Sequence, residues 1–305
     1  MGSLFACLTP GLTSVIGDDD RKEIRENQKL INFTDAEVEQ AYRCTGRIYC
    51  PGANAGRGGL QSAGAICAPG FRNAATEVCA ADRLASALHL FVDKSTGKPI
   101  REIEKCEFRN YHGHTSLLNV GDIKAFDPSI DDTRSPYANM RADKIVVRLL
   151  RPIPQCDPYD IASEEEQAEA SGREVVALTH PQEDQGPEFT GHHPLAYPCT
   201  TTKTFRARGG GPSVKYSDCD LNGGGSGGFA LFRRENGKWA IGGIFIRVGA
   251  LHLNGQIYDE TIKNYTISVG TNGDFPEIAR NPRTKKCYRT EGCDASGQDR
   301  AKPTR

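Results

Sequence analysis

The stretch NGGGSGGF, residues 222–229, sets one serine among five glycines and ends on an aromatic residue. Glycine runs of this kind are often flexible linkers. This run instead joins two patterned segments, because a strand-like segment with Cys219 precedes it and an apolar hairpin follows at once. The sequence therefore predicts a tight turn between packed elements, with Ser226 at its centre.

A serine in such a turn is suited to nucleophilic catalysis. A nucleophilic serine needs backbone amides that point at the oxygen that becomes negative, and glycine tolerates the backbone conformations that bring amides together. The amides of Gly224 and Ser226 are the candidates for this oxyanion site. Gly227 and Gly228 would let a substrate and the facing strands approach closely.

Composition and charge narrow the class of protein. The chain has 305 residues, of which 37% are hydrophobic and 25% charged, as in ordinary globular proteins. A formal net charge of −1 gives no reason to expect a nucleic acid partner, and no apolar run is long enough for a membrane span. No cofactor is expected, and no metal, because no carboxylate or cysteine completes a recognisable set around the histidine pairs.

Most of the chain is predicted to be β-strand. Short apolar runs rich in β-branched residues and bounded by turn residues occur at 46–50, 63–67, 114–120, 144–150, 174–178, 229–233, 239–248 and 265–269. Asn236-Gly237 favours a hairpin between two of these strands. Thr34 and Glu37 form the pattern of a capping box, which predicts one short helix.

The absence of a βαβ rhythm indicates an all-β protein in two halves. Residues 162–174 are the candidate for a linker or surface helix between the halves. The predicted divisions are 1–14 (a leader remnant), 15–155 (the first barrel), 156–280 (the second barrel, with the serine turn) and 281–305 (a tail).

Eleven cysteines indicate disulfides and an oxidising compartment. Their spacings are wider than the CxxC pairs of structural zinc sites. Cys7, in the short leader, is the expected unpaired cysteine. These features predict a secreted or periplasmic protein, although the leader lacks a basic start and a full apolar region.

Two motifs accompany the serine turn and the hairpin after it, VIGDDDR at 15–21 and RADKIVVRLLRPI at 141–153. In these four segments the chain resembles the trypsin-like serine proteases, most closely the bacterial glutamyl-endopeptidase-like branch. The resemblance implies two antiparallel six-stranded barrels with the site between them, and a peptide or protein substrate. It implies Asp143 as the triad aspartate and Ser226 as the nucleophile, close together at the barrel junction. It also implies a bridge between Cys67 and Cys79, while Cys199 and Cys219 bracket a glycine-rich hairpin and are the second predicted pair.

The resemblance also bears on activation and on substrate preference. Position 225 is glycine where animal digestive proteases have aspartate, so an ion pair with a freed N-terminus cannot form there. Asp220 lies where enzymes specific for basic residues keep their pocket carboxylate, but local hydrogen bonding is an equal alternative. Ile244, Phe245 and Ile246 would form the wall of the substrate pocket.

The general base is the main departure from the family pattern. The family has a TAAHC turn, and Cys79, followed by the helix-like AADRLASAL at 80–88, is the matching segment. Val78 then occupies the histidine position, and residues 46–88 contain no histidine. Because serine and aspartate need an imidazole between them, impaired catalysis is expected.

Three alternatives remain open at this stage. The chain could be a pseudoprotease that binds a peptide or protein without cleaving it, an active protease that uses His112 or His114 as base, or the product of a damaged reading frame. The substrate preference and the oligomeric state do not follow from the sequence.

Overall fold

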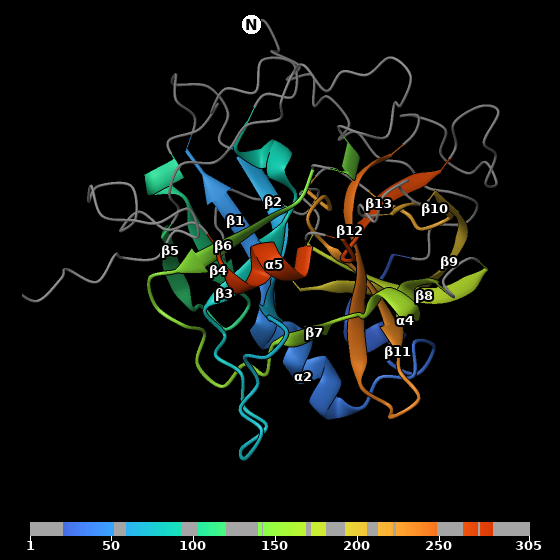
Figure 1. The fold of residues 1–305 in the computed structure, drawn as a ribbon, viewed down its shortest axis with the longest axis horizontal. Coiled ribbons are helices and arrows are strands. Elements are labelled where there is room, and N and C mark those ends of the chain that lie inside the picture. The colour runs from blue at the N-terminus through green and yellow to red at the C-terminus, as the bar shows by residue number, and fades with distance from the viewer. Residues whose placement is uncertain are drawn as a thin grey trace, which may run out of the picture.

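The structure is a computed structural model that describes residues 21–51, 59–92, 103–119, 140–141, 143–168, 172–180, 193–205, 213–221, 224–248, 265–273 and 275–282. Figure 1 shows two groups of strands side by side, with short helices around them. All described strands belong to one hydrogen-bonded sheet of 13 strands, and this sheet closes on itself twice. Closure matters because it leaves few unpaired strand edges.

The first barrel has the strand order β1-β4-β5-β6-β3-β2, and a pairing of β1 with β2 closes it. Neighbouring strands in it are antiparallel. Its strands are β1 (Thr45–Cys50), β2 (Gly59–Cys67), β3 (Arg83–Ser86), β4 (Glu107–Asn110), β5 (Thr115–Asn119) and β6 (Ile145–Leu149).

The second barrel has the order β12-β11-β8-β9-β10-β13, and a pairing of β12 with β13 closes it. Its strands are β8 (Arg173–Thr179), β9 (Leu195–Phe205), β10 (Val214–Ser217), β11 (Phe229–Arg233), β12 (Trp239–Val248) and β13 (Thr266–Gly270). The prediction of an all-β protein with two six-stranded antiparallel barrels is therefore confirmed. The exact domain limits at 155/156 and 280/281 stay predictions.

Strand β7 (Tyr159–Ile161) joins the barrels, because it runs parallel to both β2 and β12. Its central residue, Asp160, accepts hydrogen bonds from two arginines. Arg72 Nη2 lies 2.8 Å from Asp160 Oδ1, and Arg234 Nη1 lies 3.0 Å from Oδ2. Residues 162–174 contain a short helix, but the chain has already crossed to the second barrel at β7.

The helices are short and peripheral. They are α1 (Ile24–Asn27), α2 (Asp35–Cys44), α4 (Glu164–Ala168) and α5 (Phe275–Arg280), with 3₁₀ turns at Leu88–Leu90 and Ile103–Lys105. The predicted capping box at Thr34 and Glu37 is confirmed at the start of α2. Among the described residues, no helix is long and apolar enough to cross a membrane.

The barrels pack closely where β2 faces the start of β11. A Cβ atom added to Gly64 would lie 2.3 Å from the ring of Phe229, so only glycine fits there. The ring of Tyr159, on β7, also packs edge-on against that of Phe229, with 6.1 Å between the ring centroids. All three residues lie at the junction, and Phe229 directly follows the serine turn.

Residues 80–88 were expected to form a helix, and this was wrong. Arg83–Ser86 form β3, in which Leu84 pairs with Ala65 of β2 and with Val147 of β6. All four residues of the strand are buried. A strand buried on both faces lacks the alternation of polar and apolar residues by which strands are recognised, which is why the pattern was misleading.

Four disulfides connect the described cysteines. Cys67–Cys79 and Cys199–Cys219 confirm the two predicted pairs. Cys50–Cys106 links β1 to the residue before β4, and Cys44–Cys156 links the end of α2 to the segment before β7. Cys7, Cys287 and Cys293 lie outside the described residues.

The disulfides with the longest and the shortest sequence separation provide a test of this connectivity. Replacing Cys44 and Cys156 together by alanine should lower the free energy of unfolding by more than replacing Cys67 and Cys79, because the first pair closes a span of 112 residues and the second a span of 12. Chain entropy gives losses of roughly 5 and 3 kcal/mol. Denaturant unfolding measures both, and peptide mapping without reduction that joined Cys44 to any residue other than Cys156 would contradict the connectivity.

Candidate functional site

The serine turn is held against the first barrel by its glycines. The carbonyl oxygen of Gly224 accepts hydrogen bonds from both the backbone nitrogen and the Oγ of Ser62 on β2, each at 2.8 Å. Gly224 and Gly227 both have positive φ, +85° and +84°. The turn then closes through the amide of Gly228, which donates to the carbonyl of Gly225 at 3.0 Å. The prediction that this stretch is a packed turn is confirmed.

Gly227 is the point of closest approach. A Cβ atom there would lie 2.1 Å from the Ser62 carbonyl oxygen and 2.4 Å from Ser86 Oγ. A side chain would therefore collide with β2 and β3 of the first barrel in addition to straining the backbone. Gly227 thus places the serine turn directly on the strand that leads to Leu88–Leu90.

The Ser226 hydroxyl is half-buried and faces β12. Its Oγ lies 3.5 Å from the carbonyl oxygen of Ile246. The next residues pair with the same strand, because Gly227 donates to the Phe245 carbonyl at 2.7 Å and Phe245 donates to the Gly228 carbonyl at 2.9 Å. The backbone on both sides of the hydroxyl is thereby fixed.

A histidine lies beside the predicted triad aspartate. His89 Nδ1 is 2.9 Å from Asp143 Oδ2, and the backbone nitrogen of His89 donates to Asp143 Oδ1 at the same distance. Asp143 is fully buried, whereas the imidazole keeps 26% of its surface exposed. An ionised carboxylate only accepts, so beside an ionised Asp143 a neutral imidazole donates from Nδ1 and keeps the lone pair on Nε2. This is the arrangement that a general base requires.

The expectation that Val78 occupies the position of the base is corrected by this geometry. Val78 is 63% exposed, in the loop closed by Cys67–Cys79. The expectation took Cys79 as the cysteine that follows the family's histidine. The loop closed by Cys67–Cys79 instead lies before β3, the strand that leads to His89. The signal that could have found the base is SALHL at 86–90, in which His89 follows the end of a short strand and lies one residue beyond the histidine-free interval 46–88.

Ser86 and Ala87, which precede His89 in the chain, lie against the serine turn and against β12. Ser86, three residues before His89, faces Gly227, as described above. Ala87 packs in one buried cluster with Ile246, whose carbonyl lies near Ser226 Oγ. The segment that leads from β3 to His89 and the serine turn that holds Ser226 thus both pack against β12. The close distance between Ser226 and Asp143 stays a prediction.

The other described histidines are held elsewhere. His112 Nε2 lies 3.1 Å from Glu39 of α2. The backbone amide of His114 bonds Asn110, and burial lowers the pKa of its imidazole. His193 contacts Glu23, and buried His180 contacts Thr45. None of these contacts involves Asp143, so the geometry gives no support to His112 or His114 as base.

No family model and no curated protein matches the chain. Among solved structures, it is similar to the Rv3671c protease of M. tuberculosis in its active form (TM-score 0.49, 14% identity, 86% of each chain covered). It is also similar to the thermostable serine protease AL20 from an extremophilic microorganism (0.44, 16%, 75% of this chain and 91% of that one). A third is the protease Anisep from Arthrobacter nicotinovorans (0.44, 13%, 78% and 96%). At these identities none of them assigns a role to a residue here.

The arrangement of the strands decides the fold. Two closed six-stranded barrels carry a serine turn and a His–Asp pair at their junction. The chain has the trypsin-like fold. The glutamyl-endopeptidase-like branch stays a prediction.

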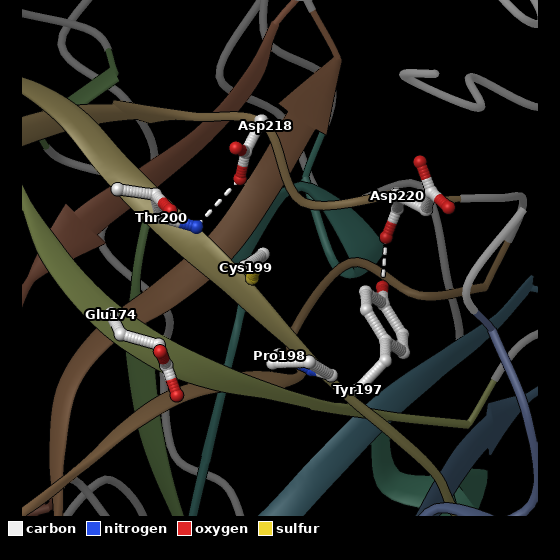
Figure 2. A pocket seen from close by; sticks show the side chains of 7 residues that line it. All are labelled: Glu174, Tyr197, Pro198, Cys199, Thr200, Asp218 and Asp220. Carbon is white, nitrogen blue, oxygen red and sulfur yellow. Dashed lines mark hydrogen bonds between the residues drawn. The ribbon is translucent and has the colours of Figure 1, made fainter. Parts of the chain in front are cut away.

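Asp220, the candidate pocket carboxylate of this trypsin-like fold, lies in the second barrel. Its carbonyl accepts a hydrogen bond from the Tyr197 hydroxyl, as Figure 2 shows, and the residue is 3% exposed. It lines a cavity of about 210 Å³ with Glu174, Tyr197, Pro198, Cys199, Thr200 and Asp218. Ile244, Phe245 and Ile246 are all buried and do not line it. The cavity therefore does not unite the residues expected to form the substrate pocket.

The same region holds the one group of metal-ligand types found among the described residues, Cys199, Asp218 and Cys219. Both sulfurs are joined in the Cys199–Cys219 disulfide. Zinc binds thiolates, which these sulfurs are not. Asp218 is itself occupied, because its Oδ1 accepts from the Thr200 amide. The group is therefore structural.

Two glycines give a test of the turn's close packing. Gly227 and Gly237 both have positive φ, but a Cβ atom at Gly237 would meet nothing within 4 Å. Gly237→Ala should therefore cost only the backbone strain, about 1 kcal/mol. Gly227→Ala should cost about 1–3 kcal/mol more, because of its overlap with Ser62 and Ser86. Thermal or denaturant unfolding compares them, and equal losses would argue against the close approach of the turn to β2.

Proposed function

We propose that the chain is a serine endopeptidase in which Ser226 is the nucleophile, His89 the general base and Asp143 the residue that orients it. The observation that carries the proposal is the contact of His89 Nδ1 with Asp143, which directs Nε2 away from the carboxylate. The proposed substrate is a peptide or protein. Four described disulfides support placement outside the cytosol, in a secreted or periplasmic setting.

Acylation begins when Ser226 Oγ attacks the carbonyl carbon of the scissile peptide bond. The hydroxyl proton passes to His89 Nε2, and Asp143 stabilises the resulting imidazolium. The carbonyl oxygen becomes an oxyanion, and the amides of Gly224 and Ser226 are its proposed donors. When the tetrahedral intermediate collapses, the leaving amine takes the proton from Nε2 and departs, so Ser226 remains as an ester.

Deacylation repeats these steps with water. His89 Nε2 removes a proton from the attacking water, the second tetrahedral intermediate forms, and the proton returns to Ser226 Oγ as the carboxylic acid leaves. Every proton in the cycle passes through one nitrogen. The proposal therefore needs no second histidine, cofactor or metal.

This proposal replaces the expectation of impaired catalysis, whose premise was that Val78 occupies the position of the family's histidine. A pseudoprotease that binds a peptide without cleaving it is the remaining rival from another class. No contact of a described residue specifically favours that rival, and it becomes an outcome of the experiment below.

The proposal predicts activity that depends on three residues. The unmodified chain should react with a fluorophosphonate probe and cleave casein. Ser226→Ala should abolish labelling, and His89→Ala should lower kcat on the order of a millionfold, as loss of one triad member does in subtilisin. Asp143→Asn should lower kcat by about 10⁴-fold, because the imidazole would take the wrong tautomer.

Two variants serve as controls. His112→Gln removes a histidine that contacts α2 and its neighbour Tyr111, and Val78→His adds an imidazole to an exposed loop, so both should retain full activity. Circular dichroism and unfolding midpoints establish that each variant is folded. A folded, unmodified protein that neither labels nor cleaves would favour the pseudoprotease, and a loss of activity in His112→Gln alone would restore that residue as a candidate.

A further inference from the structure

The peptide between Gly224 and Gly225 lies between the two amides proposed as oxyanion donors, those of Gly224 and Ser226. Glycine on both sides leaves this peptide free to rotate, since no side chain restricts it. The two amides belong to the peptides on either side of it, so the torsion angles that orient the Gly224–Gly225 peptide also set the orientation of the two amides relative to each other. Something outside the turn must therefore select one orientation.

Ser62 provides two hydrogen bonds to this peptide. Its backbone nitrogen and its Oγ both lie 2.8 Å from the Gly224 carbonyl oxygen. Since the peptide is trans, the N–H of Gly225 must point the opposite way, away from β2. Ser62 belongs to the first barrel and the turn to the second, so the orientation of the turn depends on the packing between barrels.

The Ser62 hydroxyl is itself directed. Its Oγ accepts a hydrogen bond from the His180 amide at 2.8 Å, and the His180 carbonyl is farther away, at 3.3 Å. With one proton to donate, the hydroxyl makes its shorter bond to Gly224. Ser62 is 1% exposed, so water does not compete for this bond.

Ser62 is also fixed from its other side. Ser86 Oγ donates to the Ser62 carbonyl at 2.7 Å. Backbone nitrogen, hydroxyl and carbonyl of Ser62 therefore all have partners at the barrel junction. These contacts hold the Ser62 hydroxyl in position to donate to the Gly224 carbonyl.

We propose that Ser62 is a positioning residue that locks the Gly224–Gly225 peptide so that the oxyanion amides are in place before substrate binds. The inference rests on the proposed function. Ser62 touches no reacting atom and acts only through the turn.

The first experiment compares Ser62→Ala with the unmodified protein in steady-state kinetics. The variant keeps the backbone hydrogen bond and loses the hydroxyl bond, so kcat should fall about 2- to 10-fold, the range of one net hydrogen bond. KM should stay unchanged, since oxyanion donors act on the transition state. Unchanged kcat in a folded variant would overturn the proposal.

Ser116→Ala is the matched control. Ser116 is also a fully buried serine of the first barrel, and its Oγ accepts from the amide of Arg151 instead of contacting the serine turn. This variant should lose stability as Ser62→Ala does while kcat is retained. Equal losses of kcat in both variants would mean that general destabilisation is the cause, and would overturn the positioning role.

Amide hydrogen exchange decides the matter independently of turnover. The amides of Gly227 and Gly228 are hydrogen-bonded, so their exchange reports opening of the turn. NMR should find both exchanging about 2- to 10-fold faster in Ser62→Ala and unchanged in Ser116→Ala. If the unmodified protein proves inactive, the proposed function fails, whereas unchanged exchange in Ser62→Ala overturns the role of Ser62 alone.

A second pair of variants applies if Ser62→Ala does not fold. Ser62→Thr and Ser62→Val add the same bulk and differ only in the hydroxyl. The threonine variant should retain the slow exchange of Gly227 and Gly228, and the valine variant should lose it. Equal exchange in the two variants would overturn the proposal.

Discussion

The close contact between β2 and the segment 224–229 is the constraint on which the rest of the molecule depends. Two glycines make it possible, Gly64 beneath the Phe229 ring and Gly227 against Ser62 and Ser86. Any side chain at either position would force the barrels apart. Since the serine turn belongs to one barrel and the histidine and aspartate to the other, the geometry of the site depends on packing distances that only glycine permits.

The hydrogen bonds and ion pairs around this contact favour the same alignment. Ser62 reaches the turn from the first barrel, while Asp160 of β7 accepts from Arg72 of the first barrel and Arg234 of the second. These ion pairs are partly buried, and each arginine also pairs with a second carboxylate, Arg72 with Asp157 and Arg234 with Glu166. Apolar contacts are less directional than hydrogen bonds and ion pairs. The polar groups at the junction therefore disfavour arrangements in which one barrel is shifted against the other.

Much of the fold could be predicted from local patterns. The runs at 239–248 and 229–233, with Asn236-Gly237 between them, correspond to β12, β11 and their hairpin. Strand β9 was missed because Pro198 and a run of threonines lack an apolar pattern, although seven of its residues pair with β8. Short strands such as β7 have too few residues for any periodicity, and their pairing is determined by distant parts of the chain.

The site was predictable only in part, for a related reason. Ser226 lies in a distinctive glycine run, and Asp143 precedes a clear strand. The local signal for His89, the run SALHL at 86–90, is short, and the relation of His89 to Asp143, 54 residues away, depends on β3 pairing with β6. Treating Cys67–Cys79 as a fixed marker moved the expected base to Val78, because a disulfide identifies two joined residues but not which strand follows them.

If the three residues act as proposed, their division between the barrels determines when the serine would become reactive during biosynthesis. His89 and Asp143 belong to the first barrel and can meet as soon as β3 and β6 pair. Ser226 comes later in the chain, and in the proposed site it would reach them only when the second barrel has closed and docked. Under the proposed function, a nascent or partly folded chain would therefore carry an unactivated hydroxyl, and reactivity would appear only at the last step of assembly.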